Sequence, residues 1–467
     1  MSSELEQGRE AWDRRSWRSA HAALTAAHGG EPLDALDLWR LALASYLIGR
    51  EDDFLRALEG AHQAYLDGGE PGPALRCATW LGLHLANRGD VARATGWFGR
   101  ATRLLGELEP DCAERGYALL PEGHRQIVLG DYEAASRTAA EAAAAGQRFG
   151  DRDLFTLALH MQGRALLRLG RVEEGLSLLD EAMVAVAADD LSPLVTGLVY
   201  CAVIGACREV FAVGRAQEWT AALTEWCAAQ PDMVAYTGQC RVYRAEILRR
   251  RGAWRDAIEE ARRACERFIE TAGPRAAGAA HYQQGEAHRL LGEFSAAEGA
   301  YRAASRAGNE PQPGLALLRL AQGDGPAAAA AIRRALAETP DRHRRARLLP
   351  AHIEVMLAVG DVDRARASCA ELEEIAGGCA PGIIDTMVAE ARGAIALAEG
   401  DAEGALAPLR QAWREWRDLD APYEAARARV LLGLACRALG DEEGAALELD
   451  AAREELERLG ANPPSPV

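Results

Sequence analysis

The sequence predicts an all-α fold, built as a solenoid of antiparallel helix hairpins. Glycines recur along the chain at intervals near 40 residues, and most are followed by an acidic residue and then by alanine, as in Gly89-Asp90 with Ala94. A repeat of this length is typical of stacked units that each contact only their neighbours. The glycines that set the period are called here the ruler glycines: Gly49, Gly89, Gly130, Gly170, Gly214, Gly252, Gly292, Gly323, Gly360, Gly400 and Gly440.

Each unit is predicted to contain two helices that meet at the ruler glycine. Around Gly89, residues 74–87 carry apolar positions at helical spacing, and residues 91–105 do the same. Gly89 can adopt the left-handed conformation that ends a helix, and Asp90 can cap the next one. With a degenerate unit near Trp12, the ruler glycines predict about twelve hairpins.

A pattern of small and large residues predicts how the helices interlock. Seven residues before a ruler glycine there is often a second glycine, such as Gly285, whose missing Cβ lets the partner helix cross closely. Nine residues after the ruler glycine a large residue such as Tyr301 fills the gap. Alanines five and twelve residues after it, here Ala297 and Ala304, complete a small–large–small stripe that we expect to pack one hairpin onto the next.

Two places interrupt the period. An interval of 44 residues contains a loop over 187–193, and one of 31 residues contains two prolines within 308–314. We expect a short helix over 315–322 and a change of superhelical direction near 306–314, with a tight loop and unchanged curvature as the alternative. We otherwise expect one continuous solenoid over 1–460. The proline-rich residues 461–467 are expected to form a disordered tail.

The pattern resembles the tetratricopeptide repeat (TPR), which has glycine in the first helix, Gly-Asp-aromatic at the turn, and alanine, aromatic and alanine in the second helix. This resemblance implies a TPR-like right-handed superhelical solenoid whose first helices line a concave groove. The period here is nearer 40 residues than the usual 34. The copies that match best are Gly285/Gly292/Phe294/Ala297/Tyr301/Ala304 and Gly82/Gly89/Val91/Ala94/Phe98/Ala101.

Longer segments resemble a more specific family. Residues 194–207, 215–223, 238–247, 311–323 and 419–427 are similar to the helical-repeat region of actinobacterial LuxR-type (MalT-like) transcriptional regulators, and the resemblance covers nearly all of the chain. In that family a helix-turn-helix DNA-binding domain normally follows the repeats, whereas this chain ends within seven residues of Gly460. We therefore expect either a standalone sensor or adaptor, or a DNA-binding module on another chain.

Composition excludes several classes of function. The 467 residues have a formal net charge of −17. An acidic chain is repelled by the phosphates of nucleic acids, so we expect no direct nucleic-acid binding. The sequence contains no lysine, so all 53 basic residues are arginine, and this excludes Schiff-base chemistry and the P-loop lysine. There is neither a signal-peptide pattern nor an apolar run long enough to span a membrane. We expect a cytoplasmic protein.

No residue pattern points to catalysis, a metal or a cofactor. The motifs of serine hydrolases, zinc proteases and phosphate loops are absent. Ten cysteines are scattered without a CxxC pair, and the four between Cys201 and Cys240 match no zinc spacing. His281 and His288 lie two helical turns apart, too far for one ion. We expect no catalytic residue, no metal and no cofactor.

The first helices supply the candidate binding residues. Arginine can pair bidentately with carboxylates, and tyrosine offers rigid contact area, so an acidic peptide or a terminal carboxylate would suit this set. The alternative is that Glu246–Arg249 and Glu286–Arg289 are ordinary pairs on a helix surface. The candidates for the concave groove are Tyr117, His124, His160, Arg164, Arg208, Gln239, Glu246, Arg249, Tyr282, Glu286 and Arg289.

These observations lead to a non-catalytic scaffold that binds a protein or peptide partner in its concave groove, in transcriptional or signalling regulation. The alternative is a module that senses a small molecule or a peptide pheromone, which an apolar pocket with convergent polar groups would favour. A third hypothesis is homodimerisation through the terminal hairpins. Its basis is an apolar stripe on the final helix, residues 445–459, formed by Leu447, Leu449, Ala452 and Leu456.

Overall fold

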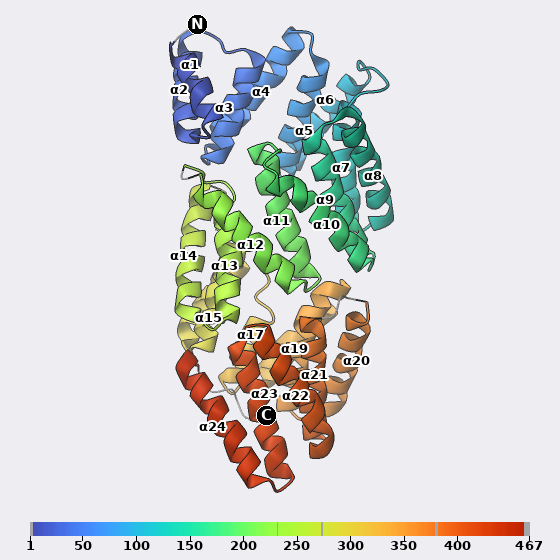
Figure 1. Cartoon of the computed structure of the whole chain (residues 1–467), viewed down its shortest axis with the longest axis vertical. Helices are drawn as coiled ribbons and strands as arrows, with labels where there is room; N and C mark the ends of the chain where they lie inside the picture. The colour runs from blue at the N-terminus through green and yellow to red at the C-terminus, as the bar shows by residue number, and fades with distance from the viewer. Residues whose placement is uncertain (1–2, 231, 272–273, 379–381, 462–467) are drawn as a thin grey trace. The chain divides into compact units, whose positions relative to one another are not determined.

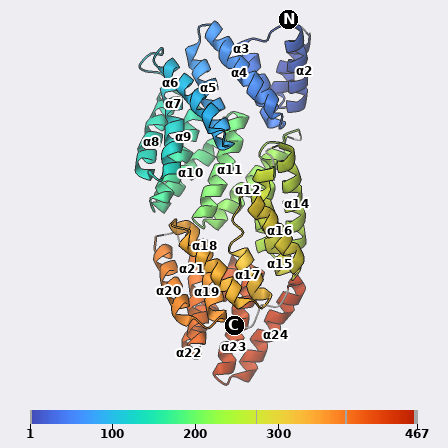
Figure 2. The ribbon, with the colours of Figure 1, turned by 180° about the vertical axis from the view of Figure 1, so that it is seen from behind.

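The computed structural model describes residues 3–230, 232–271, 274–378 and 382–461. Across these residues it contains 24 α-helices and no strand, so the predicted all-α fold of twelve hairpins is confirmed. Each odd-numbered helix forms a hairpin with the next even-numbered one, and successive hairpins lie side by side from α1 to α10 in unit 1 and from α13 to α24 in unit 2 (Figures 1 and 2). No helix in the described part of the chain is long and apolar enough to cross a membrane.

The chain divides into two compact units. Unit 1 comprises residues 1–206 and 218–237, and unit 2 comprises residues 207–217 and 238–467. The chain passes from unit 1 into unit 2 and back at the α11–α12 turn, because residues 207–217 belong to unit 2 and the rest of both helices belongs to unit 1. That residues 1–460 form one continuous solenoid stays a prediction.

The helices of the first twelve positions are α1 (Ser3–Asp13), α2 (Trp17–Gly30), α3 (Ala35–Leu47), α4 (Glu51–Asp67), α5 (Pro71–Asn87), α6 (Val91–Leu105), α7 (Glu114–Leu129), α8 (Tyr132–Phe149), α9 (Arg152–Arg168), α10 (Val172–Ala187), α11 (Pro193–Glu209) and α12 (Val213–Ala228). Those that follow are α13 (Thr237–Arg250), α14 (Trp254–Thr271), α15 (Gly278–Leu290), α16 (Phe294–Arg306), α17 (Gly314–Ala321), α18 (Gly325–Ala337), α19 (Arg342–Ala358), α20 (Val362–Ala376), α21 (Ile383–Ala398), α22 (Ala402–Asp418), α23 (Pro422–Ala438) and α24 (Glu442–Leu459). A short 3-10 helix over Pro274–Ala277 precedes α15.

The ruler glycines form the turns inside the hairpins, with one exception. Ten of the eleven have φ between 74° and 83°, the left-handed region that glycine adopts readily. Gly214 does not, and the left-handed residue of that turn is Phe211, with φ 61°. The assignment of Gly214 is therefore wrong. With Phe211 in its place, the intervals from Gly170 and to Gly252 are both 41 residues, and the irregularity disappears.

The predicted interlock of small and large residues is confirmed. A Cβ placed on Gly285 would lie 2.6 Å from Cε1 of Tyr301, and one on Gly433 would lie 2.6 Å from Cγ of Leu449. In these hairpins the first helix therefore accepts the large side chain of the second only because it has no side chain of its own at that point. Ala297, five residues after its ruler glycine, is fully buried.

Of the two expected interruptions of the period, the one near 308–314 is present in the structure. Helix α17 has only eight residues, Gly314–Ala321, which confirms the predicted short first helix. The loop over 187–193 ends where α11 begins at Pro193. The change of superhelical direction near 306–314 stays a prediction. The expected tail falls, apart from Ala461, outside the described residues.

In each unit the last segment returns to the first hairpins. In unit 1 the indole Nε1 of Trp17 donates to Gln230 at 3.0 Å, and the backbone N–H groups of Val234 and Ala235 both donate to the Leu47 carbonyl. These contacts join residues nearly two hundred positions apart, so they depend on the curvature of the array and not on local sequence.

In unit 2 the final hairpin closes on the α13–α14 turn. The rings of Trp254 and Tyr423 meet edge to face at 5.7 Å, and Arg251 forms an ion pair with Asp420 at 2.9 Å. Leu459 fits against Gly252, where a Cβ would collide with it. We call this set of contacts the clasp of unit 2.

The apolar stripe of the final helix is mostly covered by its own unit. Ala452 and Leu456 are buried, and Leu449 packs on Gly433 of α23. Only Leu447 is strongly exposed, at 66%. The stripe therefore leaves little apolar surface for a second copy of the chain, and homodimerisation stays a prediction.

Candidate functional site

Unit 2 contains a cavity of about 550 Å³, called here the unit 2 cavity. It is lined mainly by the first helices of successive hairpins and by the α11–α12 turn. Charged, polar and apolar side chains all contribute. The lining residues are Arg208, Phe211, Val213, Ala216, Glu246, Arg249, Arg250, Ala279, Tyr282, Gln283, Glu286, Asn309, Glu310, Gln312, Pro313, Thr339, Arg344, Arg347, Leu348, Ile383, Met387, Trp416 and Glu424.

Three arginines of this lining form no ion pair with a carboxylate of the described chain: Arg249, Arg344 and Arg347. The Nε of Arg249 donates to the side-chain oxygen of Gln283 at 3.1 Å. One Nη of Arg347 donates to the backbone carbonyl of Arg208 at 2.6 Å. Because a guanidinium has five N–H donors, most of the donors on these two side chains stay available to a ligand.

Glu246 is held by arginines on either side of it. It forms an ion pair with Arg208, and its other oxygen lies 3.8 Å from Arg250. Burial opposes ionisation of this carboxyl, but Arg208, Arg250 and Arg249 outweigh burial and lower its pKa to about 2. Glu246 and Arg208 therefore neutralise each other within the wall of the cavity and leave the other arginines uncompensated.

Two arginines of the lining have lowered pKa values. Burial lowers the pKa of Arg347 and the neighbouring Arg208 lowers it further, whereas Glu246 and Glu209 act in the opposite direction. Burial also lowers the pKa of Arg250, where Glu246 opposes the effect and Arg249 adds to it. An anion placed in the cavity would relieve this repulsion, because an opposite charge stabilises the ionised form of each guanidinium.

Glu286 and Arg289 form a closed network beside the cavity. One oxygen of Glu286 accepts a hydrogen bond from the Tyr301 hydroxyl at 2.5 Å, and the other accepts one from Arg289 at 3.1 Å. The Glu286 side chain is 8% exposed and that of Arg289 13%. These two residues therefore pair at i,i+3 as the alternative interpretation of the sequence expects, but the pair is buried and does not lie on a helix surface.

One part of the cavity wall is apolar. Phe211, Val213 and Met387 are half-buried and pack against the buried Ile383 and Trp416. The guanidinium carbon of Arg347 lies 5.9 Å from the centre of the Phe211 ring. The apolar wall and a charged donor are therefore adjacent.

The sequence-predicted residues separate into two groups. Five of them line the unit 2 cavity, whereas Gln239 and Arg289 lie on the same helices, α13 and α15, without lining it. The other four, Tyr117, His124, His160 and Arg164, belong to unit 1. The five in the cavity are Arg208, Glu246, Arg249, Tyr282 and Glu286.

The unit 1 residues are largely buried among their own hairpins. The Tyr117 hydroxyl donates to Asp151 at 3.1 Å, and Arg76 lies over its ring at 4.7 Å. His160 is 6% exposed, and burial together with the charge of Arg164 lowers its pKa to about 3. Burial also lowers the pKa of His124. Burial of Tyr117 and His160 explains why these two residues lie on first helices without presenting an open surface.

Sequence reasoning missed several lining residues. Arg344 and Arg347 lie on the first helix α19, so the offset used for the other arginines could have found them. Phe211 and Trp416 had no such signal, because one occupies a turn where glycine is expected and the other lies on a second helix.

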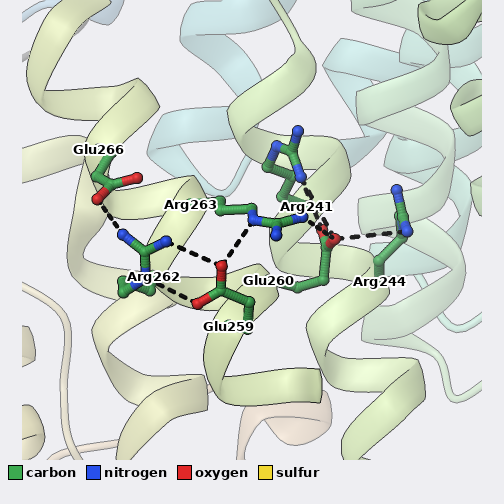
Figure 3. Close-up of polar contacts among 7 residues, drawn as sticks. All are labelled: Arg241, Arg244, Glu259, Glu260, Arg262, Arg263 and Glu266. Carbon is green, nitrogen blue, oxygen red and sulfur yellow. Dashed lines mark hydrogen bonds and ion pairs between the residues drawn. The ribbon is translucent and has the colours of Figure 1, made fainter. Parts of the chain in front are cut away.

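Four arginines of the α13–α14 hairpin that lie outside the cavity provide a contrast, because they are paired (Figure 3). On the α13–α14 hairpin the buried Glu260 accepts from Arg241 at 3.1 Å and lies 3.5 Å from Arg244. Glu259 accepts from Arg262 and Arg263 at 2.8 Å each. None of these residues lines the cavity. The unpaired arginines are therefore a distinctive property of the cavity within this hairpin region.

In the described part of the chain no group of three or more His, Cys, Asp or Glu side chains could hold a metal ion. A comparison with models of known protein families finds no match, and no curated protein matches either.

Solved structures with similar folds include other helical-repeat proteins. Because all three TM-scores lie below 0.5, these likenesses do not bear on the site or the function of this chain. They are a Rap protein complexed with competence and sporulation factor (14% identity, TM-score 0.44, 82% of this chain and 99% of that one), the APC/C hetero-tetramer Cut9–Hcn1 (12%, 0.45, 97% and 87%), and a tetratricopeptide repeat protein from Parabacteroides merdae (16%, 0.32, 68% and 98%).

Proposed function

We propose that this chain is a non-catalytic interaction scaffold that binds a peptide, or a segment of a partner protein, in the unit 2 cavity. The observation that supports this most directly is the presence of Arg249, Arg344 and Arg347 in one cavity without carboxylate partners. Their charge favours an acidic partner, because guanidinium groups bind carboxylates through two parallel hydrogen bonds. The apolar wall formed by Phe211, Val213 and Met387 supplies the contact area that a peptide side chain needs.

A small anionic molecule is the second candidate for the ligand. A volume of about 550 Å³ lies within the range of roughly 300–1,000 Å³ that is usual for small-molecule sites. In that case the chain is a sensing module of a regulator. The same arginines would bind the ligand, so variants of them test both candidates, and the chemical nature of the retained ligand separates the two.

We place this binding in cytoplasmic regulation, as the resemblance to LuxR-type transcriptional regulators implies. The proposed role is that of a sensor or adaptor in such regulation. The net charge of −17 disfavours a direct contact between this chain and DNA.

Selection from a random hexapeptide library by the immobilised full chain tests the proposal, with retained peptides read by mass spectrometry. We expect acidic peptides to be enriched by the wild-type chain and lost from the variant Arg249→Glu/Arg347→Glu. Arg208 is left unchanged, because a glutamate there would face the buried Glu246 and destabilise the fold.

The matched control is Arg306→Glu/Arg334→Glu. It makes the same change in net charge on α16 and α18, at exposed positions that do not line the cavity. Equal loss of peptides from both variants would attribute the effect to net charge and refute the assignment of the cavity. A library of small anionic metabolites, read by thermal shift, tests the second candidate with the same variants.

A further inference from the structure

We infer that the unit 2 cavity recognises the C-terminus of a peptide whose last residue is apolar, with the free α-carboxylate on Arg347 and Arg249 and the side chain against Phe211. This inference rests on the proposed function and specifies its ligand. A peptide C-terminus and a small amphipathic acid share the chemistry that this site requires, which is a carboxylate attached close to an apolar group.

The adjacency of charge and apolar surface is the main argument. The guanidinium carbon of Arg347 lies 5.9 Å from the centre of the Phe211 ring, and both line the cavity. A C-terminal residue carries its carboxylate and its side chain on the same Cα. An internal Asp or Glu would need a second residue to reach the apolar wall. The terminal residue therefore fits this arrangement with the fewest ordered atoms.

The donors are arranged to meet a carboxylate. The guanidinium of Arg347 is fixed by the Arg208 carbonyl at 2.6 Å, and that of Arg249 by Gln283 at 3.1 Å. Each contact uses one donor and orients the planar group, so less side-chain freedom is lost when a ligand binds. Among the described residues, Glu246 forms its ion pairs with Arg208 and Arg250 and makes no direct ion pair with Arg347 or Arg249.

The backbone at Phe211 is a second, independent observation. Its φ of 61° is left-handed, which is a strained conformation for a bulky aromatic residue. In the ten hairpins whose turn contains one of the other ruler glycines, that glycine adopts this conformation. Strain of this kind concentrates at functional sites, and here it places an aromatic ring on the wall of the cavity beside Val213 and Met387.

Three synthetic hexapeptide libraries test the inference against the full chain. The first ends in Leu or Phe with a free carboxylate, the second has the same sequences with a C-terminal amide, and the third ends in Ser or Asn with a free carboxylate. N-acetyl-leucine and decanoate serve as non-peptide probes of the same chemistry. We expect retained members of the first library to bind about 10- to 100-fold more tightly than their amides, as loss of a charge-assisted hydrogen bond implies.

Two variants locate the contacts. Phe211→Asn keeps a residue that tolerates the left-handed turn and removes the apolar ring, so it should abolish the preference for Leu and Phe but retain that for a free carboxylate. Arg347→Lys keeps the charge and loses the planar fork, so it should weaken binding of free-carboxylate peptides and leave the amides unchanged. Thermal unfolding of each variant establishes that it is folded.

The outcomes separate the inference from the proposed function. If amides bind as well as free acids, and Arg249→Glu/Arg347→Glu abolishes both, the scaffold stands and the terminal-carboxylate inference is overturned. If no library is retained, the proposed peptide scaffold is itself refuted. Retention of N-acetyl-leucine or decanoate without any peptide would overturn the peptide assignment and support a small-molecule site.

Discussion

Removal of one hydroxyl tests whether Glu286 belongs to the structure of unit 2 rather than to its ligand site. The change is Tyr301→Phe. It deletes the donor that lies 2.5 Å from the Glu286 carboxylate and keeps the ring that packs on Gly285. Tyr301 is 1% exposed, so water has little access to the oxygen that loses its partner.

The expected loss follows from the charge of the acceptor. A hydrogen bond to a charged group contributes about 1.5–3 kcal/mol to stability. For a domain of 150–250 residues each kcal/mol corresponds to roughly 2–4 °C, so a loss of about 2 kcal/mol lowers Tm by about 4–8 °C. Because the ring is retained, no cavity contribution adds to this value.

Scanning calorimetry of the full chain measures the effect, with Tyr132→Phe as the control, since no hydrogen bond of the Tyr132 hydroxyl occurs in the described part of the chain. The double-mutant cycle of Tyr301→Phe with Glu286→Gln should give a coupling energy within the range of about 0.5–3 kcal/mol that is usual for residues in contact. A Tyr301→Phe variant as stable as the wild type would refute the reasoning. It would show that the Glu286 oxygen is solvated or free for a ligand.

Three further predictions concern stability. Gly252→Ala and Gly360→Ala place a side chain at the same φ of 79° and share a strain of about 1–2 kcal/mol, but only Gly252→Ala also meets Leu459. It should be the more destabilising and should increase hydrogen exchange in α24, whereas equal effects would argue against the clasp. Leu409→Ala removes a fully buried side chain that fits Gly393 and should destabilise unit 2 by about 2–5 kcal/mol in urea unfolding. His160 is held neutral next to His124 and Arg164, with its pKa lowered to about 3, so the unfolded state takes up a proton below pH 6.5 that the folded state refuses. Stability should fall by about 1.4 kcal/mol per pH unit from pH 6.5 towards pH 3; His160→Gln should reduce this slope, and an unchanged slope would assign it to other groups.

The clasp of unit 2 lies close in sequence to the lining of the cavity. Trp416 and Glu424, which line the cavity, flank the Asp420 and Tyr423 that contact the α13–α14 turn. Helix α23 therefore contributes Tyr423 to the clasp and Glu424 to the cavity.

Much of the fold was predictable because its determinants are close in sequence. The turn at a ruler glycine needs a left-handed residue, and the contact between Gly285 and Tyr301 is made within one hairpin. Such contacts repeat at fixed offsets, so a single sequence reveals them. The failure at Gly214 has the same origin. The turn requires a conformation and not a residue type, and Phe211 adopts it under strain.

The site was only partly predictable. The first-helix offset selected Arg249, Glu246 and Tyr282, and these residues line one cavity. It could not show that Arg208 is neutralised by Glu246, or that Glu286 is occupied by Tyr301 and Arg289. These pairings depend on which oxygen and nitrogen atoms meet across hairpins.

By itself, then, the sequence determined the hairpin, its period, its interlock and the charge of the chain, since all of these depend on residues within one repeat or on composition. Only the tertiary structure decided where the two units separate, that Phe211 faces Arg347, and that Trp416 closes the same cavity. Residues that lie more than a hundred positions apart meet because small rotations between successive hairpins accumulate along the array. A pattern within one repeat does not specify the total rotation, so the sequence does not predict these distant contacts.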